Sequence, residues 1–426
     1  MKAIIDCNSF YCSCERLFQP HLDRKPVVVL SNNDGCIVSR TDEVKALGVD
    51  MAIPYFMAKA IIEKNDIAVF SSNYNLYGDL SRRVMDTLRS ILGNENVEVY
   101  SVDEAFLELD GFAEKDLYAA GMSIRETVEQ WTGIKVSIGI APTKVLCKVA
   151  NHLAKENKEQ TNCVVVLDTE QKINEALEKT LVKNIWGVGR QYAAMLTEMH
   201  AIFTALDLSR KKPEWMHKHM GGVVGLRLLK ELNGEPAIVM KEALTVKKMI
   251  ATTRMFGTAV HDLSDIKEAV ATYTAKAAEK LRRQGSAANM ISVFVVAKGQ
   301  DRNVSFRGNT LSAQVSLPLA TSATNELIKP AVQLAEHLFE KGRQYKKAGV
   351  MLSGLVPDDT IQANLFKEEK ANNKRLLMRM LDNVNFSMRN DVLKFAASGT
   401  KRDWKMRMEM RSPRYTSRWE EMFEVK

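Results

Sequence analysis

The stretch VEVYSVDEAFL, residues 97–107, alternates apolar and polar residues as a β-strand does, with one kink, and it carries the adjacent carboxylates Asp103 and Glu104. A second apolar run, residues 2–5, is typical of a short strand and ends at Asp6. If these strands are neighbours in one sheet, three carboxylates meet at its edge. Such oxygen-rich sites hold pairs of hard divalent cations that assist in-line phosphoryl transfer. Acidic residues at strand ends are also common as solvated loop charges, so the surrounding sequence must decide.

The composition is that of a globular protein. The chain has 426 residues, of which 46% are hydrophobic and 26% charged, and this length predicts two to four domains. We find no apolar run long enough to cross a membrane and no signal peptide, so we expect no membrane partner. The six cysteines form no C-x-x-C pair, which argues against a zinc knuckle and favours a reduced, cytoplasmic protein.

The net charge of +8 is unevenly distributed. Residues 1–110 hold 11 lysines and arginines against 17 acidic residues, whereas residues 241–350 hold 17 against 9 and residues 367–426 hold 15 against 9. A basic part joined to an acidic, metal-competent part favours a polyanion that is held by one and processed by the other. A basic face that is merely solvated would have the same composition.

The N-terminal part of the chain predicts an α/β domain with one sheet. Residues 27–30, 136–140 and 164–167 are typical of strands, and residues 77–92 carry apolar side chains at helical spacing. Turn signals are frequent between residues 20 and 75, which indicates an inserted subdomain. Residues 168–235 then predict a small helical unit.

Two glycines, Gly187 and Gly189, precede a helical run at residues 191–200. Glycines between two short helices can expose backbone N–H groups to a DNA phosphate, in a helix–hairpin–helix arrangement. A plain helix–helix turn fits the same residues, and the sequence leaves both interpretations open.

After a boundary at residues 233–236, the pattern changes to strand, helix, strand, strand, helix, strand. The six segments are residues 245–256, 264–284, 289–298, 304–317, 322–341 and 345–355. This order is the split β-α-β unit, with both helices on one face of a four-stranded sheet. Ser264 is the expected N-cap of the first helix. The fold class is therefore a multidomain combination of α/β and α+β, and the basic sheet domain can lie along a duplex backbone.

Residues 357–374 are polar and predict a linker, followed by a basic segment to the last residue. Within the linker, Gln362 is followed by the apolar residues Leu365 and Phe366. An exposed apolar pair in a polar stretch is typical of a short anchor that docks in a groove on a partner. Packing onto its own domain is the alternative.

The residues that follow Asp6 suit a nucleotide. Asn8 or Ser9 can cap the next helix, whose N-terminal backbone N–H groups then offer a seat for a triphosphate beside a metal-binding carboxylate. Tyr11 can lie under the sugar, where its ring leaves no room for a 2′-hydroxyl. For Phe10 the pattern favours core packing.

Four lysines are candidates for phosphate contact. Lys144, Lys148 and Lys155 share one face of a predicted helix, although a solvated lysine face has the same spacing. Lys45, in the inserted subdomain, can reach across to a triphosphate.

Taken together, these motifs resemble the Y-family translesion DNA polymerases, most closely the UmuC group of polymerase V catalytic subunits. The resemblance covers nearly the whole chain. It includes Asp6 with Phe10 and Tyr11, the run of residues 101–105, and the fingers-like residues 31–36. Residues 345–352 and 412–418 are similar to later segments of the group. One departure concerns Asp42 and Lys45, where many family members carry Tyr and Arg.

The resemblance implies a right-hand architecture. Its parts are a palm (residues 1–19 and 76–167), fingers (20–75), a thumb (168–235), a little finger (236–356) and a C-terminal segment (357–426) with a basic tail. It implies two Mg²⁺ ions held by Asp6, Asp103, Glu104 and the backbone carbonyl of Cys7. The implied nucleotide-binding residues are Ser9, Phe10, Tyr11, Lys45 and Lys155, with Tyr11 as steric gate.

The implied partners are primer-template DNA, deoxynucleoside triphosphates, the sliding clamp (through Gln362, Leu365 and Phe366), and UmuD-like and RecA-like proteins. The implied role is error-prone bypass of damaged DNA in the bacterial SOS response, in the nucleoid-containing cytoplasm. Two alternatives remain: a metal-dependent nuclease, and a non-catalytic scaffold that binds DNA and the clamp.

Overall fold

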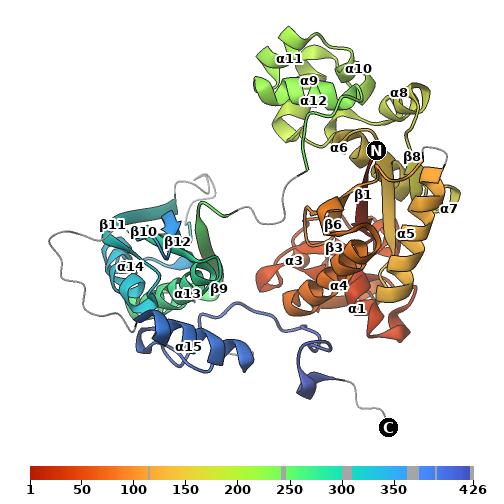
Figure 1. The fold of residues 1–426 in the computed structure, drawn as a ribbon. Helices are drawn as coiled ribbons and strands as arrows, with labels where there is room; N and C mark the ends of the chain where they lie inside the picture. The colour runs from red at the N-terminus through yellow and green to blue at the C-terminus, as the bar shows by residue number, and fades with distance from the viewer. Residues whose placement is uncertain (114–115, 241–245, 300–308, 362–373, 389–390, 423–426) are drawn as a thin grey trace. The chain divides into compact units, whose positions relative to one another are not determined.

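The computed structural model describes the whole chain except residues 114–115, 241–245, 300–308, 362–373, 389–390 and 423–426 (Figure 1). It forms two compact units. The first comprises residues 1–31, 36–245 and 410–426, and the second comprises residues 32–35 and 246–409. Within the described residues, no helix is both long and apolar enough to span a membrane.

A five-stranded sheet organises the first unit, with the strand order β5-β6-β1-β7-β8. Its strands are β1 (Lys2–Cys7), β5 (Val97–Val99), β6 (Glu104–Glu108), β7 (Val136–Ala141) and β8 (Val164–Val166). The central strand β1 pairs antiparallel with both β6 and β7, in a register that sets Asp6 opposite Glu104. The two carboxylate-bearing strands are therefore neighbours.

The segment 97–107 is not one kinked strand, as its alternation predicts, but two strands joined by a tight turn. The backbone N–H groups of Tyr100 and Ser101 both donate to the carbonyl of Glu104, at 3.0 Å each. The alternation of apolar and polar residues continues through the turn, so the sequence gives no sign that one strand ends and another begins. The consequence is that Asp103 and Glu104 lie at the start of β6, at the sheet edge.

Helices cover both faces of this sheet, so β1 is apolar on both sides. Ala3, Ile5 and Cys7 belong to the core shared with α1 (Phe10–Leu17), α4 (Tyr74–Leu92) and α5 (Leu117–Thr132). Ile4 belongs to a second core under α6 (Lys144–Glu156). Since strand side chains alternate between faces, Asp6 lies on the same face as Ile4, toward α6.

The remaining elements of the first unit form two smaller groups. The strands β2 (Val27–Leu30), β3 (Ile37–Arg40) and β4 (Ala68–Ser71) make a three-stranded sheet in the order β3-β2-β4, with α2 (Asp42–Ala46) and α3 (Tyr55–Lys64). The helical group comprises α7 (Lys158–Thr161), α8 (Glu170–Lys179), α9 (Arg190–His200), α10 (Ala205–Ser209), α11 (Pro213–His219) and α12 (Val223–Leu232). The predicted helix after Gly189 thus begins at Arg190.

The second unit has the predicted order of elements. They are β9 (Ile250–Val260), α13 (Leu263–Arg283), β10 (Ser286–Ala297), β11 (Thr310–Thr321), α14 (Thr324–Leu338) and β12 (Tyr345–Pro357). The sheet order is β11-β10-β12-β9, so β12 separates β9 from β10, as in a split β-α-β unit. The helices α13 and α14 pack against each other and against the sheet (Figure 1). The predicted fold class is confirmed.

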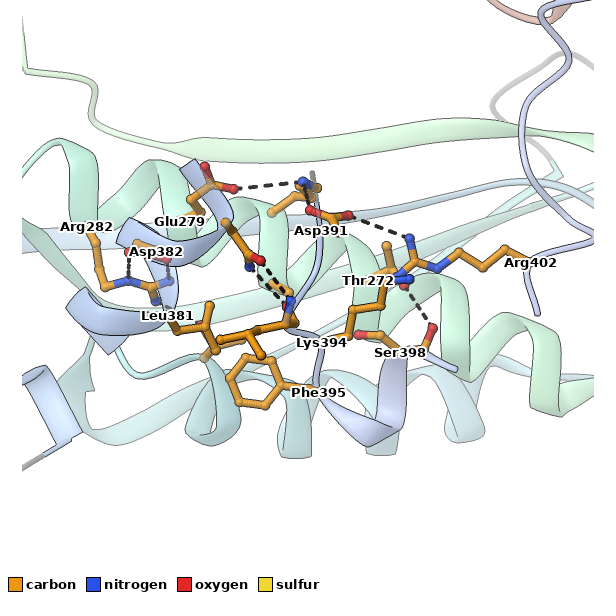
Figure 2. A pocket seen from close by; sticks show the side chains of 15 residues that line it. Thr272, Glu279, Arg282, Leu381, Asp382, Asp391, Lys394, Phe395, Ser398 and Arg402 are labelled. Carbon is orange, nitrogen blue, oxygen red and sulfur yellow. Dashed lines mark hydrogen bonds and ion pairs between the residues drawn. The ribbon is translucent and has the colours of Figure 1, made fainter. Parts of the chain in front are cut away.

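Two details of the second unit differ from expectation. The N-cap of α13 is Asp262, without a side-chain hydrogen bond, and Ser264 lies inside the helix. The segment after the predicted linker contains a helix, α15 (Lys374–Ser387), and two ion pairs join this segment to α13: Arg282 with Asp382, at 2.6 Å, and Lys276 with Asp391, at 2.5 Å. Figure 2 shows the first of these pairs, and also the pair of Asp391 with Arg402 within the segment.

The end of the chain belongs to the first unit instead. Met410 exchanges hydrogen bonds with Ser71, and the ring of Tyr415 stacks on Phe18 with centroids 4.8 Å apart. Ser412 Oγ donates at 3.0 Å to Glu15 Oε1, which also accepts from the Tyr77 hydroxyl at 2.6 Å. Glu15 is fully buried, and this burial raises its pKa to about 7 although the two hydroxyl donors favour the charged form.

Gly139 is the closest contact between β7 and α6. A Cβ atom at this position would lie 2.3 Å from the backbone nitrogen of Asn151 and 2.3 Å from the carbonyl oxygen of Cys147. Both are backbone atoms, which cannot move without moving the helix. Only glycine therefore permits this spacing between sheet and helix.

We predict that Gly139→Ala lowers the free energy of unfolding by about 2 kcal/mol or more, because α6 must shift away from β7. Gly78→Ala is the matched control, since a Cβ there meets nothing within 4 Å and lies on a helix, where alanine is favoured. Thermal and urea unfolding of both variants would check this. Equal unfolding curves for Gly139→Ala and the wild type would contradict the tight packing.

Glu15 predicts a pH dependence of stability. Its pKa is about 7 in the folded chain and near the ordinary glutamate value of 4.5 when unfolded, so between these values the folded state holds a proton that the unfolded state releases. Stability therefore falls as pH rises from about 4.5 to 7. Glu15→Gln cannot ionise and should gain stability relative to wild type over this range, by up to about 3 kcal/mol.

The measurement is the difference in unfolding temperature between Glu15→Gln and wild type at pH 5, 6, 7 and 8. Glu63→Gln, at a half-exposed glutamate of α3, is the control and should show a nearly constant difference. A constant difference for Glu15→Gln as well would rule out the raised pKa.

Candidate active site

The carboxylates of the candidate site are placed by the pairing of β1 with β6. Asp6, near the end of β1, lies opposite Glu104, the first residue of β6. The backbone N–H of Cys7 donates to the carbonyl of Asp103 at 2.9 Å, which ties the two strands together at this edge. The structure therefore brings the predicted acidic residues to one end of the sheet.

Asp6 and Glu104 are close enough that each carboxyl group shifts the pKa of the other. Burial raises the pKa of Asp6 to about 7, although the Lys155 ammonium opposes the shift. Burial would also raise the pKa of Glu104, but its contacts with Asp6 and Lys148 outweigh burial and hold this pKa below its ordinary value. Of the two carboxyl groups, Asp6 is therefore the one that holds a proton more readily.

Asp103 is adjacent but differently engaged. Its Oδ1 accepts a hydrogen bond from the Ser101 hydroxyl at 2.6 Å, within the turn that leads to β6. In the described part of the chain, no three side chains of the His, Cys, Asp and Glu types already form a metal-binding group. The structure thus joins two of the three predicted carboxylates and leaves the third beside them, bound to Ser101.

The lysines of α6 meet one acidic residue on each of three successive strands. Lys155 Nζ lies 2.5 Å from Asp6 Oδ2, and Lys148 Nζ lies 2.5 Å from Glu104 Oε1. Lys144 pairs with Glu98. The sequence correctly predicted that the three lysines share one face of the helix. It did not predict that Lys144 is fully buried, so the prediction of a phosphate contact at Lys144 is wrong.

The donor set fits a hard divalent cation. Asp6 and Glu104 each accept a hydrogen bond from a lysine ammonium group, so the carboxylate oxygens at this sheet edge already attract positive charge. Magnesium prefers such oxygen ligands. A cation bound there would displace the proton of Asp6 and weaken the lysine contacts.

The residues after Asp6 form the start of α1. Ser9 is its N-cap, in a left-handed conformation (φ 45°, ψ 47°) and without the predicted side-chain cap. Asn8 instead accepts a hydrogen bond from the Ser137 hydroxyl at 2.8 Å. Phe10 is buried in the core, as its pattern favours. In the first turn of α1, the backbone N–H of Cys12 donates to the Ser39 hydroxyl at 3.4 Å, so this group is already engaged.

Tyr11 is half-buried and contacts the ring of its neighbour Phe10 and two rings of α4. It stacks on Tyr77 with centroids 4.5 Å apart and an interplanar angle of 16°, and it meets the edge of Tyr74 at 6.0 Å. Both partners lie on α4. The ring of Tyr11 is thus fixed by neighbours that the sequence pattern did not single out.

An open cleft of about 600 Å³ lies where α2 meets the end of α6. Lys45 and Lys155 both line it, as their proposed common contact requires. Asp42 lines it too and pairs with Lys158, which the sequence reasoning missed because Lys158 lies beyond the predicted helix. The predicted clamp-binding residues Gln362, Leu365 and Phe366 lie outside the described residues.

Comparisons with known proteins agree on one family. Residues 5–152 match the impB/mucB/samB family, residues 247–365 match its C-terminal domain, and residues 375–425 match a domain of unknown function, DUF4113. Protein UmuC of Salmonella typhimurium is 41% identical over 100% of both chains, and Protein ImpB of the same organism is 38% identical over 99% of both.

A solved structure, a Y-family DNA polymerase chimera of Dbh and Dpo4, shares the fold with a TM-score of 0.69 at 21% identity, covering 84% of this chain and 99% of that one. The fold is therefore that of the Y-family DNA polymerases. Within this class, the chain belongs to the impB/mucB/samB family, the UmuC group. The predicted family and the predicted class of enzyme, a DNA-directed DNA polymerase, are confirmed.

Proposed function

We propose that this chain is a template-directed translesion polymerase that adds deoxynucleotides to a primer 3′-hydroxyl by two-metal phosphoryl transfer. The observation that carries the proposal is the register of β1 with β6, which sets Asp6 against Glu104 beside a cleft lined by Lys45 and Lys155. A polymerase needs acidic metal ligands and cationic triphosphate contacts at one place, and these are the residues at this edge.

The residues that would hold two Mg²⁺ ions are Asp6, Asp103, Glu104 and the backbone carbonyl of Cys7. When bound, the metals supply Lewis-acid stabilisation of the charge that develops on the transferred phosphoryl group. Deprotonated Asp6 is the state needed for this, and Lys155 favours that state by its charge. Asp103 must exchange the Ser101 hydroxyl for a cation, which costs one hydrogen bond.

The triphosphate would lie between Lys45, Lys155 and the first turn of α1, where the backbone N–H groups of Ser9 and Phe10 would contact it. Tyr11 would lie under the sugar and exclude a 2′-hydroxyl, a role that suits a ring fixed from behind by Tyr77. Lysine at position 45 supplies charge but not the planar fork of an arginine.

Further roles follow from the family. We propose that primer-template DNA lies along the basic sheet domain, that residues 362–366 bind the sliding clamp, and that UmuD-like and RecA-like proteins assist lesion bypass during the bacterial SOS response in the cytoplasm. The alternative is a DNA- and clamp-binding scaffold without catalysis. The lysine-paired carboxylates and the engaged Asp103 are the observations in its favour.

Glu104→Ala should abolish primer extension, with a loss of at least about 10²-fold, because a ligand of the proposed metal pair is removed. Glu108→Ala is the matched control at the other end of β6, where the glutamate pairs with Lys2. The assay is magnesium-dependent extension on damaged and undamaged templates, with UmuD-like and RecA-like proteins present. Wild-type rates for Glu104→Ala would exclude the metal assignment.

Tyr11→Ala should admit ribonucleotides and lower the deoxyribonucleotide preference by about tenfold or more, since the excluding ring is gone. The readout is the ratio of kcat/KM for a deoxynucleotide to that for its ribonucleotide. Tyr118→Ala, at an exposed tyrosine of α5, is the control. An unchanged ratio for Tyr11→Ala would dismiss the gate role.

A further inference from the structure

The last part of the chain is packed against the helices that carry the aromatic residues of the site. Residues 410–415, here called the C-terminal clasp, run beside the end of β4 and the start of α4. Ser71 exchanges hydrogen bonds with its first residue, Met410, and Phe18 stacks on its last, Tyr415. Nothing in the proposed catalysis uses this segment.

A short series of contacts leads from the clasp to Tyr11. The Ser412 hydroxyl and the Tyr77 hydroxyl donate to the same oxygen of Glu15, at 3.0 Å and 2.6 Å. The ring of Tyr77 then stacks on Tyr11 at 4.5 Å. Tyr77 and Glu15 are fully buried, so their positions depend on these few partners.

The clasp also holds the start of α4. Asn73, the N-cap of α4, donates its side-chain amide to the Ser412 carbonyl at 3.0 Å, the Ser412 hydroxyl at 3.0 Å and the Pro413 carbonyl at 3.1 Å. The first turn of α4 contains Tyr74 and Tyr77, both of which contact Tyr11. Ser412 therefore holds the α4 rings that contact Tyr11 in two ways, through Glu15 and through Asn73.

We propose that Ser412 is a positioning residue for sugar discrimination: through Glu15 and Asn73 it fixes Tyr77 behind Tyr11, and so limits how far the Tyr11 ring can withdraw from a 2′-hydroxyl. The inference rests on the proposed gate role of Tyr11. Ser412 touches no substrate and acts only through the side chains between it and the gate.

The burial of Glu15 explains why one hydroxyl has this effect. Glu15 Oε2 has no hydrogen-bond partner among the described residues, so both donors act on Oε1. Removal of the Ser412 hydroxyl takes one of the two hydroxyl donors from Glu15 Oε1, and it takes from Asn73 one of its three acceptors. A buried polar group that loses a hydrogen-bond partner shifts toward other contacts. Here Glu15 would shift, and Tyr77, whose hydroxyl is bonded to it, would move together with the ring that stacks on Tyr11.

The test uses the full chain in primer extension with Mg²⁺ and measures the deoxyribonucleotide-to-ribonucleotide ratio of kcat/KM. Ser412→Ala should lower this ratio by about threefold to tenfold, the size expected for one hydrogen bond, while deoxynucleotide kcat/KM changes by less than about twofold. Ser412→Thr keeps a hydroxyl and should restore most of the ratio. Ser387→Ala, at an exposed serine of α15 whose hydroxyl donates only to its own helix, should leave it unchanged.

A second variant makes the test independent of how Ser412→Ala folds. Tyr77→Phe keeps the stacked ring but loses the hydroxyl that Glu15 holds, so it should lower the ratio similarly. The double variant should lower it no further than the larger single effect, because both changes act through Glu15. Ratios within about twofold of wild type for Ser412→Ala and Tyr77→Phe would overturn the proposal.

Tyr11→Ala separates this failure from failure of the gate itself. If Tyr11→Ala lowers the ratio and the two clasp variants do not, the clasp has no part in discrimination although the gate stands. If Tyr11→Ala leaves the ratio unchanged, the gate role falls and the clasp proposal with it. Equal losses of deoxynucleotide and ribonucleotide kcat/KM in Ser412→Ala would indicate a merely structural contact and would also overturn the proposal.

Discussion

The candidate site depends on one constraint, the antiparallel register of β1 with β6. This register sets Asp6 opposite Glu104 and places both toward α6. Strand side chains alternate with a period of two, so a slip of one residue would turn Asp6 to the opposite face, into the apolar core of α1, α4 and α5. This slip is costly, because it would bury the Asp6 carboxyl in an apolar core and break the hydrogen bond from Cys7 N–H to the Asp103 carbonyl.

Without α6, the burial of acidic side chains at this edge of the sheet would destabilise the folded state. Asp6 and Glu104 are buried or half-buried carboxyl groups in contact, and like charges at this distance cannot both ionise freely. The lysines of α6 reduce this cost, because their spacing matches acidic residues on three strands. Gly139 permits the close approach of helix to sheet that brings the ammonium groups within reach.

The sequence predicted the parts of this arrangement that follow from local pattern. The end of β1, the split β-α-β unit and the shared face of Lys148 and Lys155 are visible in periodicity. The hairpin between β5 and β6 was missed because its alternation continues through the turn. The pairing of Lys144 with Glu98 was missed because the two residues are far apart in sequence. The contact of Ser412 with Glu15 spans almost the whole chain, and no local pattern reports it.

The clasp has a consequence for the order in which the first unit folds. Ser412 stands 397 positions after Glu15 in the sequence, yet it completes a buried cluster with Glu15 and Tyr77. On the ribosome, the N-terminal sheet can assemble while this cluster lacks Ser412. A chain that stops before Ser412 would therefore fold with an incomplete set of contacts behind Tyr11.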